Sequence, residues 1–137
     1  MTIAVATEAD ATTHILLADD NPDMRAYLER LLGVHWSVEA VGNAEAALAA
    51  MRRRRPALVL IEMMMSGLDG FGLLRAMRQD PETQDIPVLM LSAGGEDPLR
   101  LEGVGGAADD HLVKPFSSRE LLTRVAARME RQLRQMR

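Results

Sequence analysis

Apolar runs and helical periodicity alternate along the whole chain. Five short runs rich in apolar residues, at 14–18, 37–41, 58–62, 87–92 and 111–113, are separated by segments in which apolar side chains recur every three or four residues. A continuous apolar run of this length is typical of a strand buried on both faces of a sheet. The three-to-four spacing is typical of an amphipathic helix. The alternation predicts a doubly wound parallel α/β sheet with a helix between successive strands.

Capping residues mark where several of these helices begin. Asn21 stands before Pro22, and a proline suits the first position of a helix. Asn43 precedes an alanine-rich segment, and Ser117 with Glu120 has the spacing of a capping box. These signals predict helices over residues 22–32, 44–53 and 118–135, and the apolar spacing predicts another over 71–79.

A further helix is expected between residues 98 and 109, where three glycines interrupt the pattern. Gly103, Gly105 and Gly106 each cost up to roughly 1 kcal/mol relative to alanine inside a helix. We therefore expect this helix to be short, frayed or mobile.

Charged residues stand directly at the ends of the predicted strands. Asp19 and Asp20 follow the first strand, Glu62 ends the third, and Lys114 follows the fifth. The carboxyl ends of parallel strands share one rim of the sheet, and open α/β proteins bind their ligands there. Three acids at one rim repel one another unless a cation lies between them. Mg²⁺ suits such a site because it prefers oxygen ligands and commonly takes one or two carboxylates.

Composition narrows the class of protein. The chain has 137 residues, of which 47% are hydrophobic and 26% charged, as expected of one compact domain. The net charge of −4 argues against direct binding to nucleic acid. Cysteine is absent, which excludes disulfides and thiolate metal sites. No run has the length of a membrane span or the pattern of a signal peptide, so we expect a cytoplasmic protein without a membrane partner.

We expect three segments along the chain. Residues 1–13 are rich in alanine and threonine and weakly patterned, which predicts a flexible lead-in or linker. Residues 14–129 form the folded domain. Residues 130–137 continue the amphipathic pattern of the last helix beyond what the sheet can cover, and this extension could lead to another domain or form a homodimer with a second copy.

Several short motifs follow one another in a fixed order along most of the chain. They are Leu17-Ala18-Asp19-Asp20-Asn21-Pro22, Met64-Met65-Ser66-Gly67-Leu68-Asp69-Gly70-Phe71, Leu91-Ser92-Ala93, Gly106-Ala107-Ala108-Asp109-Asp110-His111-Leu112 and Val113-Lys114-Pro115-Phe116. Together they resemble the motifs of the response-regulator receiver domain of two-component signalling, and the similarity runs from about Thr13 to about Met129. The resemblance implies a flavodoxin-like sheet of five parallel strands in the order 2-1-3-4-5, with helices on both faces.

The resemblance also implies a Mg²⁺ site. Asp20 would be the principal metal ligand and Asp19 a ligand through water. Met64 would contribute its backbone carbonyl oxygen, and Glu62 would complete the acidic cluster.

One residue departs from the family pattern. Glu62 stands where the family carries the aspartate that accepts a phosphoryl group from a kinase histidine. By the same resemblance, Lys114 would neutralise one phosphoryl oxygen, Ser92 would hydrogen-bond another, and Pro115 is expected to follow a cis peptide bond.

The extra methylene of Glu62 moves its carboxylate outward by roughly one bond length, and an error of about 1 Å can reduce a positioned reaction on the order of a hundredfold. We therefore expect Glu62 to block phosphorylation, or to imitate it by reaching Lys114 or Ser92 directly. Two interpretations stay open at this point. One is an otherwise competent receiver with a single altered residue, and the other is a natural, phosphorylation-independent pseudo-receiver that serves as an interaction module.

Partners follow from the resemblance. A histidine kinase or phosphotransfer domain would supply the signal within a two-component or hybrid-kinase phosphorelay. Ser92 and His111 would act as switch residues that remodel the face formed by the helix at 98–109, the strand at 111–113 and the last helix. A downstream output domain or protein would bind this face, so we expect a conformational switch rather than an enzyme.

Two rival functions use the same rim. A flavodoxin-like module would bind a nucleotide or flavin, but no Gly-rich phosphate loop follows the first strand. A metal-dependent phosphatase would use Asp19 or Asp20 as a nucleophile, and release of phosphate from a small phosphoester would reveal it.

Overall fold

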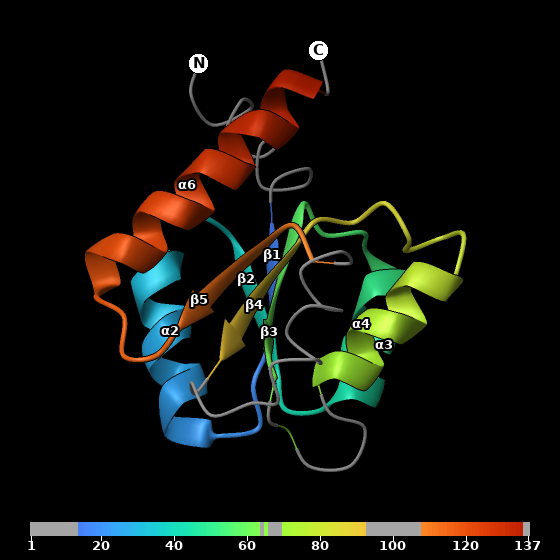
Figure 1. Cartoon of the computed structure of the whole chain (residues 1–137), viewed down its shortest axis with the longest axis horizontal. Helices are drawn as coiled ribbons and strands as arrows, with labels where there is room; N and C mark the ends of the chain where they lie inside the picture. The colour runs from blue at the N-terminus through green and yellow to red at the C-terminus, as the bar shows by residue number, and fades with distance from the viewer. Residues whose placement is uncertain (1–13, 64, 66–69, 93–107, 136–137) are drawn as a thin grey trace.

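The computed structural model describes residues 14–63, 65, 70–92 and 108–135 (Figure 1). The strands are β1 (Ile15–Ala18), β2 (Val38–Val41), β3 (Leu58–Glu62), β4 (Val88–Ser92) and β5 (Asp110–Val113). The described helices are α2 (Pro22–Gly33), α3 (Ala44–Arg53), α4 (Gly70–Gln79) and α6 (Ser118–Gln135). All four strand pairs are parallel, and the order is β2-β1-β3-β4-β5. The predicted fold and strand order are confirmed.

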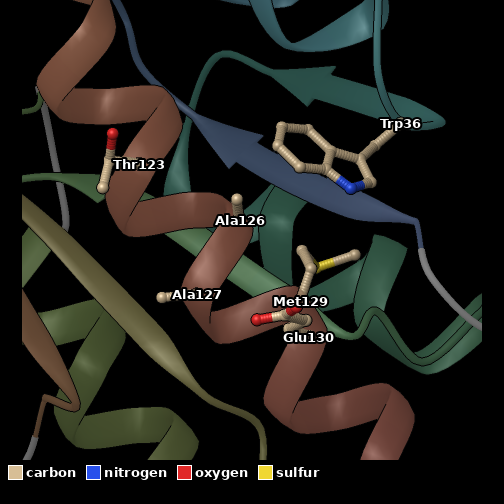
Figure 2. Close-up of a pocket in the computed structure, with 6 residues that line it drawn as sticks. All are labelled: Trp36, Thr123, Ala126, Ala127, Met129 and Glu130. Atoms are coloured by element: carbon tan, nitrogen blue, oxygen red, sulfur yellow. The ribbon is translucent and has the colours of Figure 1, made fainter.

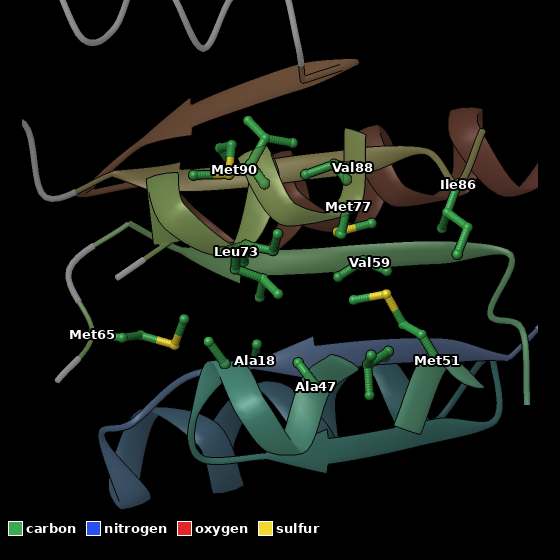
Figure 3. Close-up of a cluster of buried hydrophobic side chains, with 14 of the residues drawn as sticks. Ala18, Ala47, Met51, Val59, Met65, Leu73, Met77, Ile86, Val88 and Met90 are labelled. Atoms are coloured by element: carbon green, nitrogen blue, oxygen red, sulfur yellow. The ribbon is translucent and has the colours of Figure 1, made fainter. Parts of the chain in front are cut away.

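The two-residue alternation of the strands divides the core between the two faces of the sheet. On one face, Leu16, Val59 and Met90 pack with α3 and α4, and Figure 3 shows part of this cluster. On the other face, Leu17 and Leu60 pack with α2 and α6. In Figure 1, α2 and α6 accordingly lie on the opposite side of the sheet from α3 and α4. β3 and β4 are buried along their whole lengths, as their continuous apolar runs predict.

Side-chain caps begin the helices where the sequence predicts them. Asn21 Oδ1 accepts from the amides of Asp23 and Met24, at 3.0 and 3.1 Å. Asn43 Oδ1 accepts from the amide of Ala46 at 2.7 Å. Ser117 Oγ likewise accepts from the amide of Glu120 at 3.0 Å. These bonds satisfy amides that have no partner inside the helix.

Element boundaries differ from the prediction by a residue. β1, β2 and β4 begin one residue later than expected, whereas β5 begins earlier because Asp110 pairs with Leu89. The helix expected over residues 22–32 includes Gly33 as well, and Val34 is its C-cap in a helical conformation. Residues 1–13 and residues 98–107 of the helix expected at 98–109 lie outside the described residues, and residues 108 and 109 form a bend. No helix among the residues described is long and apolar enough to cross a membrane.

The basic run at the end of α3 makes contacts within the protein. Arg52 lies 3.7 Å from the carboxylate of Asp80, and Arg53 lies 3.0 Å from that of Glu39. Arg55 donates a hydrogen bond to a main-chain carbonyl. These contacts favour a helix-end role for the run, in keeping with the preference of positive charge for a helix C-terminus.

Candidate functional site

The parallel register brings the predicted site residues to one rim. Ala18 pairs with Ile61 across β1 and β3, and Ser92 pairs with Val113 across β4 and β5. Asp19, Glu62 and Lys114 therefore stand at the carboxyl ends of three strands in one sheet. The rim expected from the strand ends is thus present in the structure.

Asp19 is almost fully buried and only partly satisfied. Its side chain is 1% exposed, Oδ1 accepts from the amide of Asn21 at 2.9 Å, and Oδ2 has no hydrogen-bond partner among the described residues. Burial raises the pKa of Asp19, and the neighbouring Asp20 raises it further, against the lowering effects of the Asn21 amide, Lys114 and Arg25. A buried carboxylate oxygen in this condition is suited to a cation or a bound water.

Glu62 forms an ion pair with Lys114 across the rim. Lys114 Nζ donates to Glu62 Oε2, and the two side chains are 6% and 27% exposed, in the order glutamate and lysine. The expectation that the longer acid reaches Lys114 is confirmed. Because the pair is largely shielded from water, each charge depends on the other more strongly than in an exposed ion pair.

A main-chain hydrogen bond links Ser92 and Lys114. The Lys114 amide donates to the carbonyl oxygen of Ser92 at 2.7 Å, and the Ser92 side chain is fully buried. The peptide bond between Lys114 and Pro115 is cis, as predicted. Ser92 therefore stands directly beside the lysine that pairs with Glu62.

A glycine lets the start of α4 pass close to Glu62. The amide of Gly70 donates to the carbonyl oxygen of Met63 at 2.9 Å. A Cβ at Gly70 would lie 2.4 Å from the Glu62 carbonyl oxygen and 2.7 Å from Met63 Cα. Any larger residue would force the backbone at the end of β3 and the start of α4 apart.

His111 is half-buried on β5. Its Nε2 is buried and has no hydrogen-bond partner among the described residues, and its amide donates to Asp110 Oδ1 at 2.8 Å. Its role as a switch stays a prediction.

The donor set at the rim is compatible with Mg²⁺. Asp19 and Asp20 supply carboxylate oxygens, including the unpartnered Oδ2 of Asp19, and hard oxygen donors are what Mg²⁺ requires. Within the described residues, no three acidic or histidine side chains are grouped so that they could hold a metal ion. The Glu62 carboxylate is instead bonded to Lys114. Met64, whose carbonyl was expected to contribute, lies outside the described residues.

A groove of about 520 Å³ lies at the opposite end of the strands. It is bounded by Trp36, which precedes β2, and by five residues of α6, namely Thr123, Ala126, Ala127, Met129 and Glu130 (Figure 2). Among the described residues that line it, Glu130 is the only one with an ionisable side chain. The groove thus lacks the clustered charges of the rim.

Sequence reasoning missed two residues beside the acids. Arg25 Nη1 donates to the main-chain oxygen of Asp19 at 2.8 Å. Gly42 lies against the guanidinium of Arg25. The signal in the sequence that could have indicated the contact between Arg25 and Asp19 is an arginine in the helix that directly follows the strand-end acid.

Comparison with known proteins identifies the family. Residues 15–126 match the response regulator receiver domain. This chain belongs to that family. The receiver is 39% identical over 118 residues to the probable transcriptional regulator ycf27 of Pyropia yezoensis, covering 85% of this chain and 47% of the relative. It is 38% identical over 96 residues to the phosphate regulon transcriptional regulatory protein PhoB of Rhizobium meliloti, covering 70% and 42%.

The receiver also resembles solved structures of the family. The receiver domain of the Francisella response regulator 1452 superposes with a TM-score of 0.78 at 28% identity, over 88% of this chain and 98% of that one. The chain spans about half the length of the curated relatives described above. Receivers are signalling modules of two-component systems rather than enzymes, and their partners include a histidine kinase.

Proposed function

We propose that this receiver is a phosphorylation-type conformational switch in which Glu62 occupies the position of the phosphoryl-accepting aspartate. The ion pair between Glu62 and Lys114 is the observation that carries the proposal. In this arrangement the carboxylate takes the place that a phosphoryl oxygen would have beside the lysine. Glu62 thereby blocks phosphoryl transfer and imitates part of its electrostatic result, with one negative charge where a phosphoryl group carries nearly two.

The surrounding residues would support phosphoryl transfer if an aspartate replaced Glu62. A carboxylate oxygen of this aspartate would attack the phosphorus atom of the phosphodonor. The bond between phosphorus and the leaving group of the donor would break, and the leaving group would take the electron pair. Lys114 would hold one phosphoryl oxygen and Ser92 another. Asp19 and Asp20, with the carbonyl of Met64, would hold Mg²⁺. The bound metal would neutralise negative charge on the phosphoryl group.

Output is proposed to pass through β5 and α6. Ser92 and His111 would move when the acceptor position is filled, and the face that includes β5 and α6 would be remodelled for an output domain, an output protein or a second copy. The relatives' names support an output in transcriptional regulation. Arg124 already links the two elements, because its Nη1 donates to Asp110 Oδ1 at 2.7 Å.

Intact-protein mass provides the test. The chain as given and the variant Glu62→Asp are each incubated with Mg²⁺ and a small phosphodonor such as acetyl phosphate. We expect only Glu62→Asp to gain one phosphoryl group, and Glu62→Asp combined with Lys114→Ala to gain much less. Glu62→Gln is the matched control for charge, and it should gain none.

A second function would follow from the opposite result. If neither the parent chain nor Glu62→Asp gains a phosphoryl group, the site is not competent for transfer. The domain would then be a phosphorylation-independent pseudo-receiver that serves as an interaction module. The ion pair of Glu62 and Lys114 would in that case have a purely structural role.

A further inference from the structure

Arg25 on α2 reaches back to the end of β1. Its Nη1 donates a hydrogen bond of 2.8 Å to the main-chain carbonyl oxygen of Asp19. The Asp19 amide donates to Val41 on β2 at 3.1 Å, and Asp19 Oδ1 accepts from the Asn21 amide at 2.9 Å. The Asp19 amide, its carbonyl and one of its carboxylate oxygens are therefore each engaged, while Oδ2 is buried without a partner among the described residues.

The guanidinium of Arg25 occupies space that Gly42 leaves open. Gly42 directly follows β2, and a Cβ at this position would lie 3.1 Å from Arg25 Nη1 and 3.7 Å from Arg25 Cζ. A contact of 3.1 Å is tighter than ordinary packing, so an alanine would require the guanidinium to shift by a few tenths of an ångström. Arg25 and Gly42 thus connect the ends of β1 and β2 beside the acidic pair.

We propose that Arg25 is a positioning residue that fixes the Asp19 main chain so that Asp19 and Asp20 present their carboxylates to a divalent cation. Gly42 provides the space that this position requires. The inference rests on the proposed function, since it requires the acidic pair to bind Mg²⁺. Mutation of a residue that orients a metal ligand without touching the metal typically lowers the metal affinity by about 10–100-fold.

The hydrogen bond of Arg25 and its positive charge have opposite effects on the affinity for Mg²⁺. The positive charge of the guanidinium repels a cation, so its removal by itself would tighten Mg²⁺ binding. Loss of the hydrogen bond to Asp19 would weaken binding, because the acids would no longer be held. The sign of the change in Mg²⁺ affinity therefore distinguishes a positioning residue from a nearby charge.

Isothermal titration of the full chain with Mg²⁺ at constant ionic strength gives the first test. We expect Arg25→Met to weaken Mg²⁺ binding by about tenfold. Arg25→Lys keeps the charge and one donor group, and it should recover part of the affinity. Arg30→Met is the matched control, because it removes the same charge from an exposed position in the last turn of α2 and should leave the affinity nearly unchanged.

Gly42→Ala tests the position of Arg25 with all charges retained. We expect this variant to weaken Mg²⁺ binding less than Arg25→Met does, because the guanidinium shifts but keeps its charge and its donor groups. Gly33→Ala is its control, because a Cβ at Gly33 meets no atom within 4 Å. Urea unfolding without Mg²⁺ is measured for every variant to show that it is folded under the titration conditions. We expect the losses of affinity to occur in fully folded variants.

The outcomes separate this inference from the proposed function. A parent chain that binds Mg²⁺ while Arg25→Met binds it equally or more tightly overturns the role of Arg25 alone. An affinity of Gly42→Ala equal to that of the parent chain overturns the role of Gly42. A parent chain that binds no Mg²⁺ overturns the metal site of the proposed function and this inference with it.

Discussion

At the scale of single residues, Glu62 and Lys114 form an ion pair that is largely shielded from water. We expect Lys114→Met to lower the free energy of unfolding by about 1–3 kcal/mol at pH 7, because Glu62 is left as a buried charge without its lysine. The double variant Glu62→Gln/Lys114→Met should regain most of that loss.

Urea unfolding without metal provides this measurement. Val113→Thr, at an exposed position beside Lys114, serves as a control for mutation in this segment. The single variant Glu62→Gln completes the comparison. Strict additivity of Glu62→Gln and Lys114→Met would show that the pair is not coupled, and the proposed imitation of a phosphoryl contact would lose its support.

His14 makes the stability of the fold depend on pH. The residue is 1% exposed and precedes β1. Burial lowers the pKa of His14 below its ordinary value of 6.5, and Arg54 lowers it further, against a raising effect of Glu39. The unfolded chain therefore binds a proton at a higher pH than the folded chain does.

Stability should accordingly fall as the pH drops below about 6.5 and level off below the pKa of the folded state. Each unit of difference between the two pKa values corresponds to about 1.4 kcal/mol. We expect His14→Leu to remove this part of the pH dependence between pH 7 and pH 5, measured by urea unfolding at each pH. His35→Gln, at an exposed histidine, should retain it. An unchanged slope in His14→Leu would exclude His14 as its source.

At the scale of elements, the approach of α4 to β3 depends on Gly70. A Cβ there would lie 2.4 Å from a main-chain oxygen, which no side-chain movement can relieve. We expect Gly70→Ala to lower the free energy of unfolding by about 1–3 kcal/mol or more. Gly33→Ala, inside α2 with open space around it, should be neutral or stabilise the protein by up to about 1 kcal/mol. Equal stabilities of the two variants in urea unfolding would contradict the close packing.

The N-terminal ends of the helices could be predicted from local sequence signals. Asn21, Asn43 and Ser117 each cap a helix with the side chain that the sequence predicts, because a cap involves amides only two or three residues away. The C-terminal end of α2 was predicted less well. A glycine near a helix end is a weaker signal, since it can continue the helix, as Gly33 does.

At the scale of the whole molecule, binding of Mg²⁺ at the rim should stabilise the fold. A ligand at ten times its dissociation constant adds about 1.4 kcal/mol to the free energy of unfolding. We expect millimolar Mg²⁺ to raise the midpoint of thermal unfolding by a few degrees relative to a sodium chloride control of equal ionic strength. Asp20→Asn should lose this shift, and a shift of equal size in Asp20→Asn would place the cation elsewhere.

The sequence by itself determined the elements, their caps and the residues that stand at the strand ends. Asp19, Asp20, Glu62 and Lys114 could be placed at one rim because parallel strands align their carboxyl ends. The order 2-1-3-4-5 came from the family motifs, since periodicity does not say which strands are neighbours.

Only the tertiary structure decided which of these groups meet. It paired Glu62 with Lys114, brought Arg25 to the main chain of Asp19, and showed why Gly42 and Gly70 lack side chains. Caps involve residues close in the chain, and strands buried on both faces show in the sequence as continuous apolar runs, so a sequence pattern can indicate both. Contacts between strand ends and helices depend on register and on the packing distance between layers, and these are set by the whole core at once.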